Sequence, residues 1–131
     1  MKPIIPVLAV VAILLAGCMT TAPPTTGGYT DVTAAEAKEL IDTTPGLVII
    51  DVSPIYDQGH IPGAVNYYVG DGSLDAAIPN LDPNAPYLVY CHTTAASILG
   101  AQKLADAGFS RVYRLEGNVE AWRAAGYPWE T

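Results

Sequence analysis

The chain has 131 residues, half of them hydrophobic, and its 6 basic and 13 acidic residues give a formal net charge of −7. Nucleic-acid binding depends on clustered Lys and Arg that neutralise phosphates, and no such cluster occurs, so the composition argues against nucleic acid as a partner. The length suits one folded domain and is too short for two.

An apolar segment opens the chain. Residues 4–16 are apolar or proline and follow a single lysine, and the segment ends in Leu15-Ala-Gly-Cys18. This run falls short of the ~20 residues of a membrane-spanning helix, and small residues follow it as at a processing site. We therefore predict an export signal over residues 1–17.

The ending Leu-Ala-Gly-Cys resembles a lipobox, the prokaryotic sequence at which a cysteine is lipidated. The resemblance implies that Cys18 becomes the first mature residue and carries lipid. The protein would then be anchored to the outer side of the cytoplasmic membrane, or to another membrane of the cell envelope. An ordinary signal peptide or a short uncleaved anchor are the alternatives.

A polar, uncharged stretch follows the predicted lipid anchor. Residues 19–30 contain five Thr, two Pro and two Gly, which is typical of a flexible tether, so we assign residues 18–30 to the lipidated cysteine and the tether. Residues 31–131 remain as the folded domain. Without Lys2 the mature chain has 5 basic and 13 acidic residues, a net charge of −8. A lipidated Cys18 cannot form a disulfide, which leaves Cys91 as a free thiol.

Helix and strand signals alternate along the domain. Thr33 and Glu36 have the spacing of a capping box and predict a helix to about Asp42. Apolar runs predict strands at 47–50, 64–69, 87–90 and 111–115, and further helices are predicted near 73–78, 95–107 and 119–125. This alternation predicts an α/β fold with a mainly parallel sheet flanked by helices on both faces.

Cys91 is the candidate nucleophile, because it directly follows the predicted strand 87–90 and leads into the helix 95–107. Ligands bind at the carboxyl ends of parallel strands. The N-terminus of a helix favours an anion such as a thiolate, and the small residues of the loop would let its amides turn inward as a nest. We therefore expect Cys91 to be reactive rather than buried and inert. The alternative is a thiol that fills space in the core.

Two further segments resemble the motifs of a known family. The segment Asp51-Val-Ser-Pro-Ile-Tyr-Asp-Gln-Gly-His-Ile-Pro-Gly-Ala64 is similar to the rhodanese-like stretch in which an aspartate ends a strand and Gly-His-Ile-x-Gly-Ala follows. Arg114-Leu-Glu-Gly-Asn-Val-Glu-Ala-Trp-Arg-Ala-Ala-Gly-Tyr-Pro128 resembles the family's closing motif. Cys91 opens a loop of the family's length between them, so the resemblance covers about residues 31–130.

The resemblance implies a sulfurtransferase. In rhodaneses the loop cysteine takes a sulfane sulfur from a small sulfur-containing donor, holds it as a persulfide and passes it to a thiol or another thiophile. Cys91 would carry the sulfur, and no metal or organic cofactor would be needed. The loop backbone would cradle the anion, through His92, Thr93, Thr94, Ala95, Ala96 and Ser97.

The loop departs from the family at positions that matter for donor binding. Rhodanese loops often run Cys-Arg-x-Gly-x-Arg-Ser, whereas the three marked positions here are His92, Thr94 and Ala96. Thr94 would be strained if its backbone needs a positive φ. Ser53 stands where an arginine commonly follows Asp-Val, and the segment from there to Gly59 is about two residues short. We expect poor use of thiosulfate.

Several other polar and aromatic residues have plain structural interpretations. His60 is expected to hydrogen-bond within its turn, and Trp122 and Trp129 to be core and lid residues. A metal site formed by His60, His92 and Cys91 lacks ligand spacing. Asp51 has two interpretations, a hydrogen-bonded carboxylate at a strand end or a group that orients the Cys91 loop.

Two other functional classes are weighed against the enzyme. A rhodanese-like module without catalysis would bind a partner or sense sulfide or redox state at the cell surface. Phosphatases of the same fold use a loop one residue longer, closed by an arginine. Ser97 is the sixth residue after Cys91 here, so nothing would clamp a transferred phosphoryl group.

Overall fold

The computed structural model describes residues 28–131. The predicted signal peptide, Cys18 and most of the predicted tether lie outside the described residues, so those predictions stay untested. Within residues 28–131, no helix combines the length and the apolar character needed to cross a membrane.

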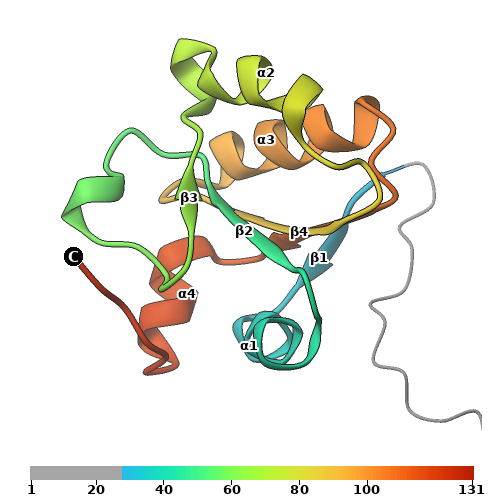
Figure 1. Ribbon diagram of the computed structural model, residues 1–131. Helices are drawn as coiled ribbons and strands as arrows, with labels where there is room; N and C mark the ends of the chain where they lie inside the picture. The colour runs from blue at the N-terminus through green and yellow to red at the C-terminus, as the bar shows by residue number, and fades with distance from the viewer. Residues whose placement is uncertain (1–27) are drawn as a thin grey trace, which may run out of the picture.

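A single five-stranded sheet forms the centre of the domain (Figure 1). The strands are β1 (Thr30–Val32), β2 (Val48–Asp51), β3 (Val65–Asn66), β4 (Pro86–Tyr90) and β5 (Arg111–Leu115). Their order across the sheet is β1-β5-β4-β2-β3, and every pairing is parallel. The predicted α/β fold with a parallel sheet is therefore confirmed, and β4, which leads to Cys91, is its middle strand.

Helices cover both faces of the sheet, with α1 and α4 below it and α2 and α3 above it in Figure 1. The four α-helices are α1 (Ala34–Thr43), α2 (Ser73–Ala77), α3 (Thr94–Asp106) and α4 (Asn118–Ala124). Three short 3-10 helices complete the domain, η1 (Tyr56–Gln58), η2 (Val69–Asp71) and η3 (Ile78–Asn80).

The sheet separates two apolar cores. Successive strand residues face opposite sides of the sheet. Ile49 and Leu88 therefore join the core between the sheet and helices α1 and α4, whereas Ile50 and Val89 join the core between the sheet and helices α2 and α3. All five residues of β4 are buried. Burial on both faces explains why these strands are continuous apolar runs in the sequence.

The capping box predicted for the first helix is present. The Thr33 hydroxyl oxygen accepts a hydrogen bond from the Glu36 amide at 3.1 Å, and a Glu36 carboxylate oxygen accepts one from the Thr33 amide at 3.1 Å. These bonds satisfy two amides that a helix start otherwise leaves unpaired, so α1 begins where the sequence predicts.

Two strands differ from the prediction. The strand expected over residues 64–69 is only two residues long, because its partner β2 ends at Asp51, which pairs with Asn66. The chain then turns into η2. The edge strand β1 was not predicted, and it begins at Thr30, which the sequence had suggested for the tether. Three residues are too few to show a strand pattern.

Candidate active site at the β4–α3 loop

Cys91 lies directly after the middle strand and is almost completely buried. It is 2% exposed and belongs to the core under α3, beside Val52 and Val89. The expectation that Cys91 is reactive rather than buried and inert is therefore wrong about burial, and the reactivity of the thiol stays a prediction. The reason for the burial is its packing in the core between the sheet and α3, to which that helix contributes Ala96, Ala101 and Leu104.

The N-terminus of α3 lies beside the thiol. The helix begins at Thr94, one residue earlier than predicted, with Thr93 as its N-cap. Ser97 is the first residue whose amide bonds back along the chain, to the Thr93 carbonyl at 3.2 Å. The amides of residues 94–96 thus precede the intrahelical bonds and carry the partial positive charge of a helix start. The Thr93 hydroxyl lies 3.9 Å from Cys91 Sγ.

Backbone strain occurs at Asn118 and not at Thr94. Thr94 is helical, so the expected strain of a positive φ at this position is absent. Among the described residues other than glycine, only Asn118 has a positive φ, at 53°. Asn tolerates this left-handed conformation better than most residues do, and strained positions often lie at functional sites.

Asn118 also fastens the Cys91 loop. Its side-chain oxygen accepts a hydrogen bond from the Cys91 amide at 3.4 Å, and its side-chain nitrogen donates to the Thr94 hydroxyl at 3.4 Å. The next amide, of Val119, donates to the Cys91 carbonyl at 3.2 Å. Sequence reasoning missed this role. The signal was the pair Gly117-Asn118, since both residues favour positive φ.

The buried side chain of Arg114 supports the first turn of α3 and forms an ion pair with the exposed Asp31. Ser97 is fully buried, and its hydroxyl donates to the Thr94 carbonyl at 3.0 Å and accepts from Arg114 Nη1 at 3.1 Å. Arg114 is 4% exposed, and its Nε donates to an Asp31 carboxylate oxygen at 2.7 Å. Arg114 opens the segment that resembles the family's closing motif, but its contact with Ser97 was not predicted, because the contact joins two elements 17 residues apart in sequence.

Asp51 lies at the end of β2, the strand that pairs with β4. It is fully buried, and Oδ1 accepts a hydrogen bond from the Ser53 amide at 2.8 Å. Its register partner is Tyr90, whose hydroxyl accepts from the Ile61 amide at 3.0 Å. Burial, together with the nearby Asp51 carboxylate, raises the pKa of Tyr90. These contacts make Asp51 part of the strand-end structure, and none of its described bonds reaches Cys91.

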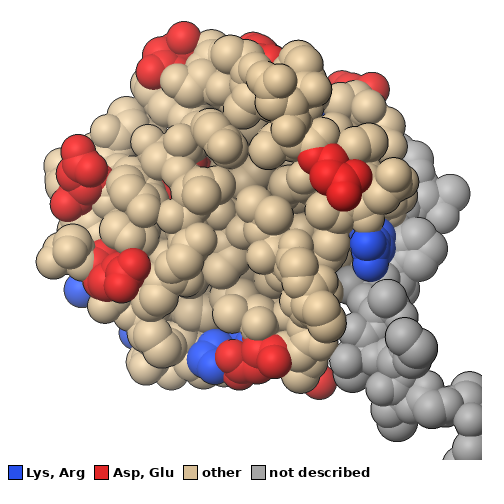
Figure 2. Space-filling model, in the orientation of Figure 1, with Lys and Arg blue, Asp and Glu red and all other residues tan. Residues whose placement is uncertain are grey.

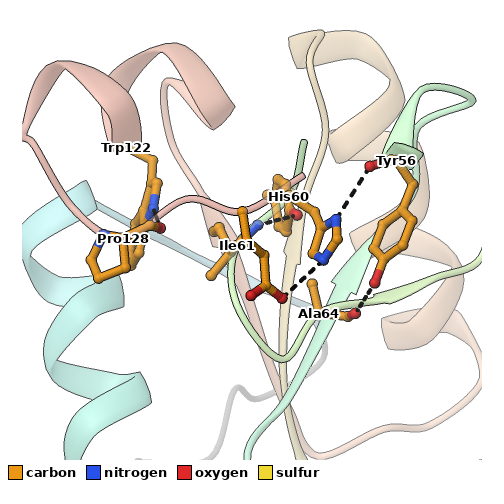
Figure 3. A network of polar contacts seen from close by, with 8 residues as sticks. Tyr56, His60, Ile61, Ala64, Trp122 and Pro128 are labelled. Carbon is orange, nitrogen blue, oxygen red and sulfur yellow. Dashed lines mark hydrogen bonds and ion pairs between the residues drawn. The ribbon is translucent and has the colours of Figure 1, made fainter. Parts of the chain in front are cut away.

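His60 ties the β2–β3 connection to the C-terminal segment (Figure 3). One imidazole nitrogen donates to the Tyr56 carbonyl at 3.2 Å, and the other lies 3.1 Å from a Glu130 carboxylate oxygen. The Trp122 indole donates to the Pro128 carbonyl at 2.8 Å, which fastens the same segment to α4. Among residues 28–131, no three His, Cys, Asp or Glu residues are grouped for metal binding.

Trp129 brings the C-terminal segment to the candidate site. Its indole lies against Gly59, where a Cβ atom would be only 2.2 Å from the indole nitrogen. The ring also meets the His92 ring edge-on, with 6.2 Å between centroids. His92 Nε2 is buried and has no hydrogen-bond partner among the described residues. Trp129 therefore packs against His92, the residue that directly follows Cys91.

Comparisons with known proteins agree with this arrangement. The rhodanese-like domain family matches residues 33–125. A thiosulfate sulfurtransferase GlpE from Pseudomonas entomophila is 39% identical over 88 residues, which cover 66% of this chain and 78% of that protein.

Solved structures of rhodanese-like proteins and sulfur transferases are similar to this chain in fold. The rhodanese-like domain of the Alr3790 protein from Anabaena superposes with a TM-score of 0.68 and 30% identity, covering 76% of this chain and 77% of that one. The polysulfide-sulfur transferase homodimer from Wolinella succinogenes has a TM-score of 0.65 and 25% identity, covering 78% of each chain. The fold, the sequence motifs and these relatives together place this chain in the rhodanese-like family.

Proposed function

We propose that the protein is a sulfurtransferase in which Cys91 carries a sulfane sulfur as a persulfide. The observation that carries this proposal is the position of Cys91, at the carboxyl end of the middle strand β4 and beside the unpaired amides of α3, in a chain of the rhodanese-like family. Its relatives include proteins named as thiosulfate and polysulfide-sulfur transferases.

The chemistry is covalent catalysis in two displacements. In the first, the Cys91 thiolate attacks a sulfane sulfur of the donor. A new S–S bond forms, the donor's bond to that sulfur breaks, and the remainder leaves with the electron pair, as sulfite does from thiosulfate. In the second, an acceptor thiolate attacks the outer sulfur, and Cys91 leaves as a thiolate. The amides of residues 94–96 stabilise the anion in both steps.

The burial of Cys91 limits which donors react. At 2% exposure the cysteine admits only a slender donor that reaches it end-on. Once loaded, the outer sulfur lies one S–S bond, about 2 Å, beyond the cysteine sulfur, so it is easier for an acceptor to reach. Polysulfide and small persulfides are unbranched at the sulfur that is transferred and have this shape.

Thiosulfate is expected to be a poorer donor. It is a dianion, and Ala96 stands where the family often has arginine. The described residues contain 13 acidic and 5 basic side chains, and Figure 2 shows acidic groups spread around the margin of one face without a basic cluster. The overall field therefore opposes the approach of a dianion.

We also propose that the mature protein is exported and begins at a lipidated Cys18. The apolar run over residues 4–16 and the Leu-Ala-Gly-Cys ending support this proposal. Two or three acyl chains would anchor the domain stably, whereas one would hold it only weakly. The domain would then act on sulfur compounds outside the cytoplasm.

Mass spectrometry of peptides from the full-length protein tests the sulfur-transfer proposal. The full chain is exposed to polysulfide or to a small persulfide, and a gain of about 32 Da is expected on the peptide that contains Cys91. A following incubation with a thiol should remove it. Cys91→Ser should gain nothing at this peptide, whereas Cys18→Ala should load Cys91 as the wild type does.

The competing function is a rhodanese-like module that binds a partner or senses sulfide without turnover. The deep burial of Cys91 and the missing loop arginine favour it. Two results would support it: no donor loads Cys91, or Cys91 takes a sulfur that no acceptor removes.

A further inference from the structure

Arg114 has an unusual place for a cation. Of the five basic side chains among residues 28–131, it is the one that is buried, and its Nη1 donates to Ser97 in the first turn of α3. The N-terminus of a helix already carries partial positive charge, so a cation there is unfavourable and an anion is favourable. A buried charge in such a place needs a negative partner.

Asp31 supplies only part of that negative charge. Its carboxylate accepts from Arg114 Nε at 2.7 Å, but the Asp31 side chain is 43% exposed while the Arg114 side chain is 5% exposed. Water and salt screen the exposed carboxylate more than the buried guanidinium. The guanidinium edge that faces Ser97 meets only a neutral hydroxyl. The underside of the α3 N-terminus therefore retains positive potential.

We propose that Arg114 is a positioning residue of the candidate site that supplies, from beneath the loop, the positive charge that the loop itself lacks. It fixes the first turn of α3 through Ser97, whose hydroxyl holds the Thr94 carbonyl. Its charge adds to that of the amides of residues 94–96 and so favours anions at Cys91. This inference rests on the proposed function, in which Cys91 carries the anionic persulfide.

The test compares alkylation of Cys91 by iodoacetate, which is anionic, with alkylation by the neutral iodoacetamide. Both reagents meet the same sulfur and the same burial, so the ratio of their rates reports the local potential. The full-length chain is used, and modification is followed on the peptide that contains Cys91, so Cys18 does not contribute. The ratio needs no sulfur donor, so it is independent of whether sulfur transfer occurs.

Arg114→Gln should lower the iodoacetate-to-iodoacetamide rate ratio by roughly threefold to tenfold. A cleft lined by several charges of one sign changes the association rate of a charged reagent by about tenfold or more, and only one charge is lost here. Arg114→Lys keeps the charge and should retain most of the ratio. Asp31→Asn removes the counter-ion and should raise the ratio by about twofold, since an exposed carboxylate is screened. Arg111→Gln is the matched control, from the other end of β5, and should change the ratio little.

The opposite signs expected for Arg114→Gln and Asp31→Asn separate a charge effect from loosened structure, which would change both reagents alike. Thermal unfolding checks that each variant is folded. If Arg114→Gln does not fold, the rate ratio of Asp31→Asn still tests the proposal. The proposal is overturned if both variants shift the ratio in one direction, if Arg111→Gln matches Arg114→Gln, or if neither reagent modifies Cys91 in the folded wild type. If sulfur loading fails while the ratios follow this pattern, the proposed function falls and the role of Arg114 stands.

Discussion

The side chain of Asn118 holds the backbone of Cys91, because the Asn118 side-chain oxygen accepts a hydrogen bond from the Cys91 amide. Asn118 itself adopts a φ of 53°. Asn118→Ala loses the side-chain bonds and leaves a Cβ residue in a left-handed conformation, so the free energy of unfolding should fall by about 1–2 kcal/mol. Asn118→Gly loses the same bonds without that strain and should change stability by less than about 1 kcal/mol.

Both Asn118 variants should load sulfur on Cys91 more slowly than the wild type, since both free the loop. Urea unfolding and the rate of the Cys91 mass gain measure the two effects separately. If Asn118→Gly loads sulfur at the wild-type rate, the side chain has only a local structural role.

A second prediction concerns the contact between Gly59 and Trp129. Gly59→Ala places a methyl group where a Cβ atom would lie 2.2 Å from the indole nitrogen, so Trp129 must move. The chain has two tryptophans, and Trp122 is 1% exposed, so a red shift of the fluorescence and greater quenching by acrylamide should come from Trp129.

Gly63→Ala is the control for Gly59→Ala. Gly63 also has a positive φ, of 83°, but no atom lies within 4 Å of its added Cβ. This variant should lose stability through backbone strain, about 1 kcal/mol, with the fluorescence unchanged. Equal spectra for the two variants would show that Trp129 does not rest on Gly59.

The sequence predicted the elements that buried apolar residues and capping signals define. The Thr33 and Glu36 pair, the run Leu47–Ile50 and the strand before Cys91 all led to elements close to those observed. The two edge strands were harder, because β1 and β3 have three and two residues and depend on partners far along the chain. Their limits are set by tertiary pairing and carry no local pattern.

The sequence predicted the candidate nucleophile but not the residues whose hydrogen bonds hold its loop in place. Cys91 follows from its place between a strand and a helix. Asn118 and Arg114 belong to the segment that resembles the closing motif, but their contacts with the Cys91 loop join residues 17 to 27 positions apart, and the sequence does not show which residues they meet. The burial of Cys91 depends on the tertiary packing of α3 against the sheet, which a run of small residues in the loop does not reveal.

A third prediction is a loss of stability in alkaline solution that depends on Tyr90. Burial, with a further contribution from the Asp51 carboxylate, raises the pKa of this phenol in the folded protein. The neutral phenol is therefore favoured by folding, and this contribution is complete below the unfolded value of about 10 and is lost progressively as the pH rises above it.

Tyr90→Phe should show a flatter decline of stability above about pH 10, at the cost of lower stability at pH 7, because the Ile61 amide loses its acceptor. Urea unfolding from pH 7 to pH 11 measures both effects. Tyr113 is less buried but also has a raised pKa, so Tyr113→Phe serves as the comparison and should flatten the curve less. Parallel curves for wild type and Tyr90→Phe would contradict the prediction.

The fourth prediction places the lipid on Cys18. Cells that express the wild type and are fed a labelled fatty acid should yield a labelled protein in the membrane fraction. Cys18→Ala should be unlabelled, because the thiol that receives the lipid is gone, whereas Cys91→Ala should be labelled like the wild type. Label that persists in Cys18→Ala would place the lipid elsewhere or leave an uncleaved anchor as the explanation.

The last prediction is that Ala96→Arg raises the use of thiosulfate selectively. Ala96 lies in the first turn of α3 and is half-buried against the core that includes Cys91. An arginine there would add a charge-assisted contact to the dianion, worth about 1.5–3 kcal/mol, or roughly one to two powers of ten in kcat/KM if the contact forms only with donor and transition state. Turnover with a small persulfide donor, which carries less charge than thiosulfate, should change less.

Gln102→Arg is the matched control for Ala96→Arg, because it adds the same charge to an exposed position of the same helix, away from its N-terminus. A general decrease of the negative charge would raise thiosulfate use equally in both variants, whereas a local contact raises it only in Ala96→Arg. If Ala96→Arg raises turnover with both donors to the same extent, the position controls loop shape and not donor charge. If it changes neither while the wild type already uses thiosulfate well, the charge that binds the dianion comes from another residue, and Arg114 is then the first to substitute in the thiosulfate assay.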